Sequence, residues 1–180
     1  MTTGMRSTRG VRSSPAPGGD VVTVERIIPA PAEAIFALIA DPSRHHLFDG
    51  SGTVRVSTNA PPRLVLGAKF NMRMKMGFSY TMTNEVIEFD EGRRIAWQPR
   101  PAFPLAGWLG GRIWRYELEP VAGGTRVRET WDMTKERWIA PWARRLAFGA
   151  PGFRFMVKPA RARDSMTTTL QRIEELVGAH

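Results

Sequence analysis

The chain has 180 residues, no cysteine and a formal net charge of +9 at neutral pH. This length suffices for one domain with a sizeable core, and the lack of cysteine excludes disulfides and thiol catalysis, as in a cytoplasmic protein. No apolar run approaches the roughly 18 residues that predict a membrane span, and residues 1–20 lack the apolar stretch of a secretory signal. We expect these 20 residues to form a disordered basic tail, followed by one domain over residues 21–178.

The first part of this domain predicts a strand and two short helices. Residues 21–28 are rich in β-branched side chains and end at a proline, which is typical of a strand. Pro31 favours a helix start, and Asp41 can cap a second short helix. A short strand is then expected over residues 53–57, with Val54 and Val56 facing inward.

Residues 69–83 alternate between polar and apolar side chains almost without fault. This period of two predicts extended strand with one wet and one apolar face. The parity is the same on both sides of Gly77, which favours a hairpin whose loop is Met76, Gly77 and Phe78. In that register Met74 pairs with Tyr80, and Met72 pairs with Met82.

The apolar face of this hairpin is mostly methionine. Methionine is unbranched and polarisable, so it suits a surface that adapts to a ligand better than it specifies a tight core. The alternative is an ordinary half-buried sheet in which methionine fills space.

The rest of the chain predicts more strands and one long helix. A parity shift toward Ile87 and Phe89 indicates a bulge near Glu85. Further strands are expected over residues 94–98, 112–119 and 125–133, with a long Pro- and Gly-rich loop over residues 99–111. An amphipathic helix is expected over residues 159–177. The predicted class is therefore α+β, with one antiparallel sheet covered by a C-terminal helix.

Several local motifs resemble the START-like, Bet v 1-like helix-grip superfamily (SRPBCC), and within it bacterial polyketide cyclase/dehydrase-like proteins. They are the IPAPAEAIF segment at residues 28–36, the DPSR break at 41–44, TNEV at 83–86, RRIAW at 93–97, GGTRV at 123–127 and ETWD at 129–132. The resemblance covers residues 21–178. It implies a curved sheet wrapped around the last helix, with an apolar ligand cavity between them.

The chain departs from the family pattern at two places. Phe48 stands where many relatives have a tryptophan, and residues 135–158 form a longer and more basic connection than usual. The superfamily contains carriers, cyclases, hydrolases and sensors, so the resemblance implies the fold more firmly than the function.

If the cavity is present, the inward positions of the strands and the helix would line it. Aromatic walls with a few polar groups are typical of small-molecule sites, although a packed core would use the same residues. The candidate ligand-binding residues are Phe70, Met72, Met74, Tyr80, Met82, Trp97, Trp114, Tyr116, Trp131, Met166 and Leu170.

Glu129 shares the parity of Val127 and Trp131 and should therefore point inward. A buried carboxyl group must be paired, hydrogen-bonded or protonated, and a salt bridge to an arginine such as Arg112 would satisfy it. Alternatively, Glu129 could move a proton in an aldol-type cyclisation or dehydration. Asn84 and His46 are the other candidate catalytic residues, with His46 as a base at the mouth of the cavity. The alternative for His45 and His46 is a polar rim at the end of the second short helix.

The net charge is concentrated in two segments. Residues 1–20 contribute +2 and residues 135–163 contribute +7, so the rest of the chain is neutral. Cationic and aromatic residues together favour an anionic surface such as a membrane, while a solvated connection is the alternative. The candidate contact residues are Trp138, Trp142, Arg144, Arg145, Phe153 and Phe155.

Three functions are compatible with this sequence. The first is binding or transport of a lipid-like or polyketide-like molecule, and the second is a cyclase, aromatase or dehydratase acting in the same cavity. The third is an interaction module that uses the basic residues 135–163. Adjacent histidines without well-spaced partners predict no metal site, and we expect no cofactor. Nucleic acid is disfavoured because no recognition motif accompanies the charge.

Overall fold

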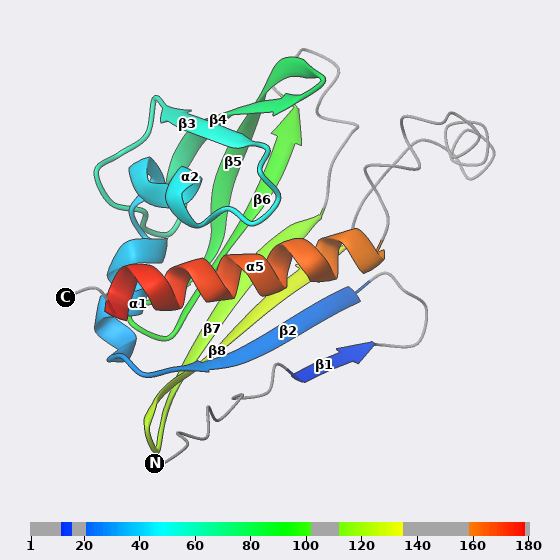
Figure 1. Ribbon diagram of the computed structural model, residues 1–180. Helices are drawn as coiled ribbons and strands as arrows, with labels where there is room; N and C mark the ends of the chain where they lie inside the picture. Colours follow the sequence, from blue (N-terminus) through cyan, green and yellow to red (C-terminus); the bar gives the residue numbers. More distant parts are fainter. Residues whose placement is uncertain (1–11, 16–20, 102–111, 135–158, 179–180) are drawn as a thin grey trace, which may run out of the picture.

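The computed structural model describes residues 12–15, 21–101, 112–134 and 159–178. Its main element is an antiparallel sheet that curves around one long helix, α5 (Pro159–Gly178), which lies across the inner face (Figure 1). The sheet order is β1-β2-β8-β7-β6-β5-β4-β3. The strands are β1 (Arg12–Pro15), β2 (Val21–Ile28), β3 (Val54–Thr58), β4 (Lys69–Met76), β5 (Phe78–Asp90), β6 (Arg94–Pro101), β7 (Ile113–Val121) and β8 (Gly124–Asp132).

The short helices fill the connection between β2 and β3. Helix α1 (Ala32–Ile39) follows Pro31, and its C-terminal Ala40 donates a backbone hydrogen bond of 2.8 Å to the carbonyl of Phe36. The 3₁₀ turn η1 (Pro42–Arg44) begins at Asp41, whose carboxylate accepts a hydrogen bond from the Ser43 amide. Helix α2 (His45–Phe48) then leads toward β3. The predicted strand and helix pair are therefore confirmed.

One apolar core lies between the sheet, α1 and α5. Helix α5 contributes Met166, Leu170 and Ile173, which are fully buried at the spacing of one helix face. Its salt bridge from Glu174 to Arg26 joins the helix to β2. This α+β arrangement confirms the helix-grip architecture expected from the sequence.

The β4–β5 hairpin has the predicted register. Met74 pairs with Tyr80 and Met72 with Met82, and Gly77 at the turn has a φ angle of 77°, which glycine adopts without steric cost. The period-two pattern and the unchanged parity across Gly77 were sufficient to predict this pairing.

Four local expectations were wrong. Val56 is 45 % exposed, because a bulge between Val54 and Val56 turns it outward. The bulge in β5 lies between Val86 and Glu88, so Ile87 also faces outward. Strand β6 continues to Pro101 into the expected loop.

The fourth difference concerns the N-terminal tail. Residues 12–15 of the expected disordered segment form β1, which pairs with β2 at the open edge of the sheet. An edge strand presents unpaired backbone groups that such a segment can satisfy.

Candidate functional site

The inner face of the sheet places the predicted ligand-binding residues in one core. Phe70, Met72, Trp97, Tyr116 and Trp131 are buried on the strands, and Met166 and Leu170 cover them from α5. The remaining candidates are only partly buried; they are Met74, Tyr80, Met82 and Trp114. Three of these, Met74, Tyr80 and Met82, lie on the β4–β5 hairpin. The inner face is therefore less tightly covered at the hairpin than at the middle of the sheet.

Aromatic rings form a continuous stack across the core. The His45 ring stacks on Trp97 with a centroid distance of 5.2 Å, and Trp97 stacks on Tyr116 at 5.5 Å. Phe70 meets both His45 and Trp97 edge-to-face. Aromatic contacts of this kind contribute about 1 kcal/mol each beyond their buried area. The stack therefore connects the short helix α2 to the middle of the sheet.

The stack ends at a buried carboxyl group. The Tyr116 hydroxyl donates a hydrogen bond of 2.8 Å to Oε1 of Glu129, and the two residues are directly opposite each other on β7 and β8. Glu129 is 2 % exposed, and its second oxygen, Oε2, has no hydrogen-bond partner among the described residues. A buried polar atom without a partner costs free energy and marks a position where a ligand could bind.

Burial raises the pKa of Glu129 from 4.5 to about 8. The Tyr116 hydrogen bond acts in the opposite direction, while the negative charge of Asp49 raises the pKa further. Glu129 is therefore largely protonated at neutral pH, and its free oxygen can carry a hydrogen-bond donor. A protonated carboxyl group in an apolar interior can hold a ligand oxygen or transfer a proton.

His45 is a second buried titratable group. Its Nε2 lies 2.8 Å from the carbonyl oxygen of Ile39, which can only accept, so Nε2 carries the proton and Nδ1 is an acceptor. Nδ1 has no hydrogen-bond partner in the part of the chain that the structure describes, and burial lowers the pKa of His45 to about 4. The polar rim that the sequence offered as one interpretation of this position is wrong for His45, because α2 turns its ring onto Trp97.

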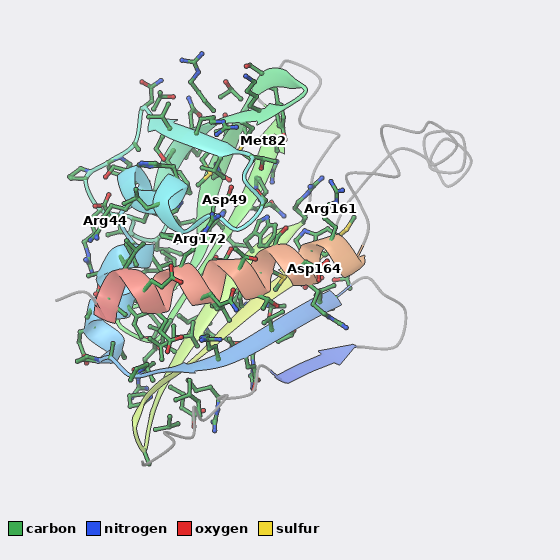
Figure 2. All side chains as sticks on the ribbon, in the orientation of Figure 1. Arg44, Asp49, Met82, Arg161, Asp164 and Arg172 are labelled. Carbon is green, nitrogen blue, oxygen red and sulfur yellow. The ribbon has the colours of Figure 1, made fainter. Side chains whose placement is uncertain are left out.

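The loop after α2 holds α5 over this interior. The Gly50 amide donates a 3.0 Å hydrogen bond to Oγ1 of Thr169, and Arg172 donates to the carbonyl of Asp49. Figure 2 places Asp49 and Arg172 next to each other between α2 and α5. The Asp49 carboxylate accepts hydrogen bonds from the amides of Thr53 and Val54, which orders the loop. Burial is the main cause of the raised pKa of Tyr80, Tyr116 and Glu129, and the negative charge of Asp49 acts in the same direction on all three.

The comparison with known families agrees with this architecture. The family described as "Polyketide cyclase / dehydrase and lipid transport" matches residues 20–178. The chain belongs to this family.

Relatives of the chain add little about its chemistry. The protein Rv0088 of Mycobacterium tuberculosis is 37 % identical over 130 residues, which cover 64 % of this chain and 54 % of that protein. The chain therefore spans about half the length of the curated relatives it matches.

Solved structures of other bacterial proteins share this fold. A protein from Arthrobacter aurescens has a TM-score of 0.65 at 13 % identity, covering 94 % of this chain and 92 % of that one. A polyketide cyclase-like protein from Corynebacterium glutamicum has a TM-score of 0.53 at 22 % identity, with coverages of 91 % and 94 %.

Within this family fold, the three candidate catalytic residues do not come together. Asn84 is buried on β5, where its amide nitrogen lies 3.3 Å from the carbonyl oxygen of Phe70. Its strand is three places from the strand of Glu129 in the sheet, a separation of about 14 Å. His46 is exposed, and its Nδ1 lies 2.9 Å from the carbonyl oxygen of Ser43.

Glu129 has a different partner from the one that the sequence suggested. It points inward as predicted, but it forms no ion pair with an arginine in the described part of the chain and is held by Tyr116 instead. The pairing follows from the register of β7 and β8, which periodicity within one strand cannot supply. The only available signal was that both residues have inward parity.

The remaining sequence predictions lie outside the described residues or concern metals. The contact residues Trp138, Trp142, Arg144, Arg145, Phe153 and Phe155 all fall in residues 135–158, so their role stays a prediction. Among the described residues, no three potential ligands gather as a metal site would require, and no helix there is both long and apolar enough to cross a bilayer.

Proposed function

We propose that the protein binds a hydrophobic small molecule, lipid-like or polyketide-like, between the inner face of the sheet and α5. The observation that carries this proposal is that Oε2 of Glu129, in a mainly apolar interior, has no hydrogen-bond partner among the described residues. A buried carboxyl oxygen without a hydrogen-bond partner lowers the stability of the fold, and a ligand that forms a hydrogen bond with it would remove this penalty. The family's description, which names both cyclases and lipid transport, supports the same class of ligand.

The chemistry of Glu129 suggests what the ligand carries at its polar end. Tyr116 occupies Oε1 as a donor, so the protonated Oε2 is free to donate one hydrogen bond. A carbonyl, ether or hydroxyl oxygen on the ligand would accept it, while the rest of the molecule contacts methionine and aromatic side chains. The methionines of the hairpin can adjust to ligands of different shape.

Native mass spectrometry of the freshly purified protein tests this proposal. We expect a stoichiometric apolar adduct, which denaturation would release for identification. A protein that carries no adduct and takes up neither offered lipids nor aromatic polyketides would contradict the proposal, because its interior would then be filled by its own side chains.

Shortening the methionines of the hairpin should weaken ligand binding more than folding. Met74 and Met82 are only partly buried, so Met74→Ala together with Met82→Ala removes ligand contacts at limited cost to the core. We expect affinity for the identified ligand to fall about tenfold or more, since each lost side chain removes roughly 1 kcal/mol or more of apolar contact. Ile87→Ala, on the outward side of β5, is the control and should leave affinity unchanged. An unchanged affinity in the double variant would remove the hairpin from the site.

A second candidate function is a cyclase or dehydratase that uses Glu129 as its acid and base. The raised pKa of Glu129, about 8, favours this reading because a proton donor near neutral pH is what such a step needs. In an aldol-type cyclisation, Glu129 would protonate the carbonyl oxygen as the carbon–carbon bond forms. It would regain a proton from the carbon that attacks.

Glu129→Gln distinguishes the enzyme from the carrier. The amide keeps the size of the side chain and an acceptor for Tyr116, but it cannot supply a proton. For an enzyme, we expect turnover of a polyketide substrate to fall at least about 100-fold while binding persists. Full turnover in this variant would exclude Glu129 from the mechanism.

A further inference from the structure

The outer face of the sheet divides into two regions of different charge. In the region formed by β2, β7, β8, residues 85–90 of β5 and residues 94–97 of β6, cations are matched by carboxylates. Examples are Arg115 with Glu88 at 2.5 Å, Arg126 with Glu119 at 2.6 Å and Arg128 with Glu25 at 2.6 Å. An open hollow of about 320 Å³ in this region is lined by both signs of charge. The cations of this region are therefore paired with carboxylates of the same region.

The other region carries cations but no acidic residue of its own. Strands β3 and β4, residues 78–84 of β5 and residues 98–101 of β6 contain no aspartate or glutamate. We call their cations the hairpin basic face; its members are Arg55, Lys69, Arg73, Lys75 and Arg100, and all are exposed. Lys69 lies 4.0 Å from Glu85, the first residue of the other region, and Arg73 and Lys75 pair with no carboxylate of the described chain.

The strand register arranges most of these cations on one plane. Lys75 is opposite Ser79, Arg73 is opposite Thr81, and Thr83 is opposite both Asn71 and Arg100. Alternate residues of a strand are about 7 Å apart, and facing residues are about 5 Å apart. Cations and hydroxyl groups therefore alternate over a nearly continuous surface. The hairpin's opposite face carries the methionines and Tyr80.

We propose that the hairpin basic face docks on an anionic lipid membrane. Closely spaced cations with hydroxyl donors between them complement a surface of many phosphate groups, and each cation near such a surface adds to the attraction. Val56 is 45 % exposed and faces outward beside Arg73, so an apolar side chain is available at the margin. The part of the chain outside residues 1–20 and 135–163 has no net charge. Because this face gathers cations, the rest of that part carries an excess of carboxylates, and this asymmetry of charge orients the domain on an anionic surface.

Other anionic partners fit this face less well. Its outer positions on β4 and β5 hold asparagine, serine and threonine between the cations, with no aromatic ring on which a nucleic-acid base could stack. Its centre also lacks the large apolar or aromatic anchor on which protein interfaces depend. Docking here would bring the hairpin that carries the ligand-facing methionines to the membrane. This consequence rests on the proposed function, but the docking itself does not.

Vesicle flotation with the full chain tests the docking. The vesicles are phosphatidylcholine with and without phosphatidylglycerol, at low and at physiological salt. We expect binding only to the anionic vesicles, weakened by salt. Arg73→Glu with Lys75→Glu should weaken it at least about tenfold. Both sites are exposed, so folding should be unaffected, as circular dichroism and denaturation would verify.

Two matched variants make the test specific. Arg93→Glu with Arg126→Glu changes the net charge equally at the far end of the sheet and should alter binding less than about twofold. If this control lost as much vesicle binding as the Arg73 and Lys75 variant, only the net charge would matter, and the proposal would be overturned. The second variant is Arg144→Glu with Arg145→Glu. If vesicle binding were lost in this variant alone, the contact would belong to residues 135–163, and the proposal would also be overturned.

Two further outcomes would also overturn the proposal. One is unchanged vesicle binding in the Arg73 and Lys75 variant. The other is binding of a short RNA, but not of vesicles, that depends on these two residues. Flotation needs no knowledge of the bound molecule, so failure here is distinct from failure to find an adduct by native mass spectrometry.

Discussion

Gly50→Ala should lower the free energy of unfolding by about 3 kcal/mol or more. A Cβ atom at residue 50 would lie 2.0 Å from the carbonyl oxygen of Ser165 and 2.7 Å from the amide nitrogen of Thr169. Both are backbone atoms of α5, so the whole helix would have to move. The shift would also stretch the hydrogen bond from the Gly50 amide to Thr169. Chemical denaturation followed by circular dichroism would measure the loss.

Gly52→Ala is the control for this prediction. Residue 52 lies in the same loop and has a φ angle of 66°, but its Cβ would meet nothing within 4 Å. Only the strain of the left-handed conformation remains, at about 1 kcal/mol. Equal losses in the two variants would show that the loop does not pack against α5. Because α5 covers the proposed ligand site, Gly50→Ala should also weaken ligand binding, whereas Gly52→Ala should not.

Stability should fall by about 2 kcal/mol as the pH rises from about 6.5 to 8, because Glu129 must ionise in the core. Its pKa is raised from 4.5 to about 8, so the folded protein holds a proton that the unfolded chain has released. The stabilisation from this proton is complete below pH 4.5 and is lost as the pH rises toward 8. Urea denaturation at a series of pH values would record the decline.

His45 shapes the acidic side of the same profile. Burial lowers its pKa from 6.5 to about 4, so the unfolded chain binds a proton that the folded protein excludes. Its contribution is present above pH 6.5 and is lost as the pH falls toward 4. Between about pH 4.5 and 6.5 the two groups oppose each other, and their slopes of about 1.4 kcal/mol per pH unit nearly cancel. We therefore expect a plateau there, with lower stability on either side.

Glu129→Gln isolates the carboxyl group in this profile. The variant should lose the decline above pH 6.5. It should also lose the plateau, because the slope caused by His45 is then no longer opposed and stability falls as the pH drops from 6.5 toward 4. A wild-type profile that stays flat from pH 6.5 to 8 would mean that Glu129 is ionised and paired in the folded protein. The same outcome would remove the proton donor on which the proposed ligand contact depends.

Local sequence patterns were sufficient for much of this fold. Strict alternation over residues 69–83 and a glycine at the turn determined the hairpin register, since a strand has only two faces and a shift of one residue would bury the lysines. The same alternation predicted that Glu129 faces inward with Val127 and Trp131. Helical spacing predicted the buried face of α5, and local motifs identified the superfamily.

Contacts between distant segments could not be predicted in this way. Tyr116 is the partner of Glu129 because β7 and β8 pair in one register, whereas the sequence suggested an arginine such as Arg112. His45 was expected at a rim, yet α2 packs it against Trp97, which is 52 residues later in the chain. The close approach of Gly50 to α5 joins residues more than 100 positions apart.

The sequence by itself therefore determined the elements, their faces and the family, because each depends on neighbours within a few residues. Only the tertiary structure decided which polar groups became partners and which were left without one. It showed that Oε2 of Glu129 has no partner among the described core residues, and that the charged side chains of the sheet's outer face separate into a paired region and a basic one. The physical reason is that hydrogen bonds and ion pairs act over a few ångströms in space, whatever the separation along the chain.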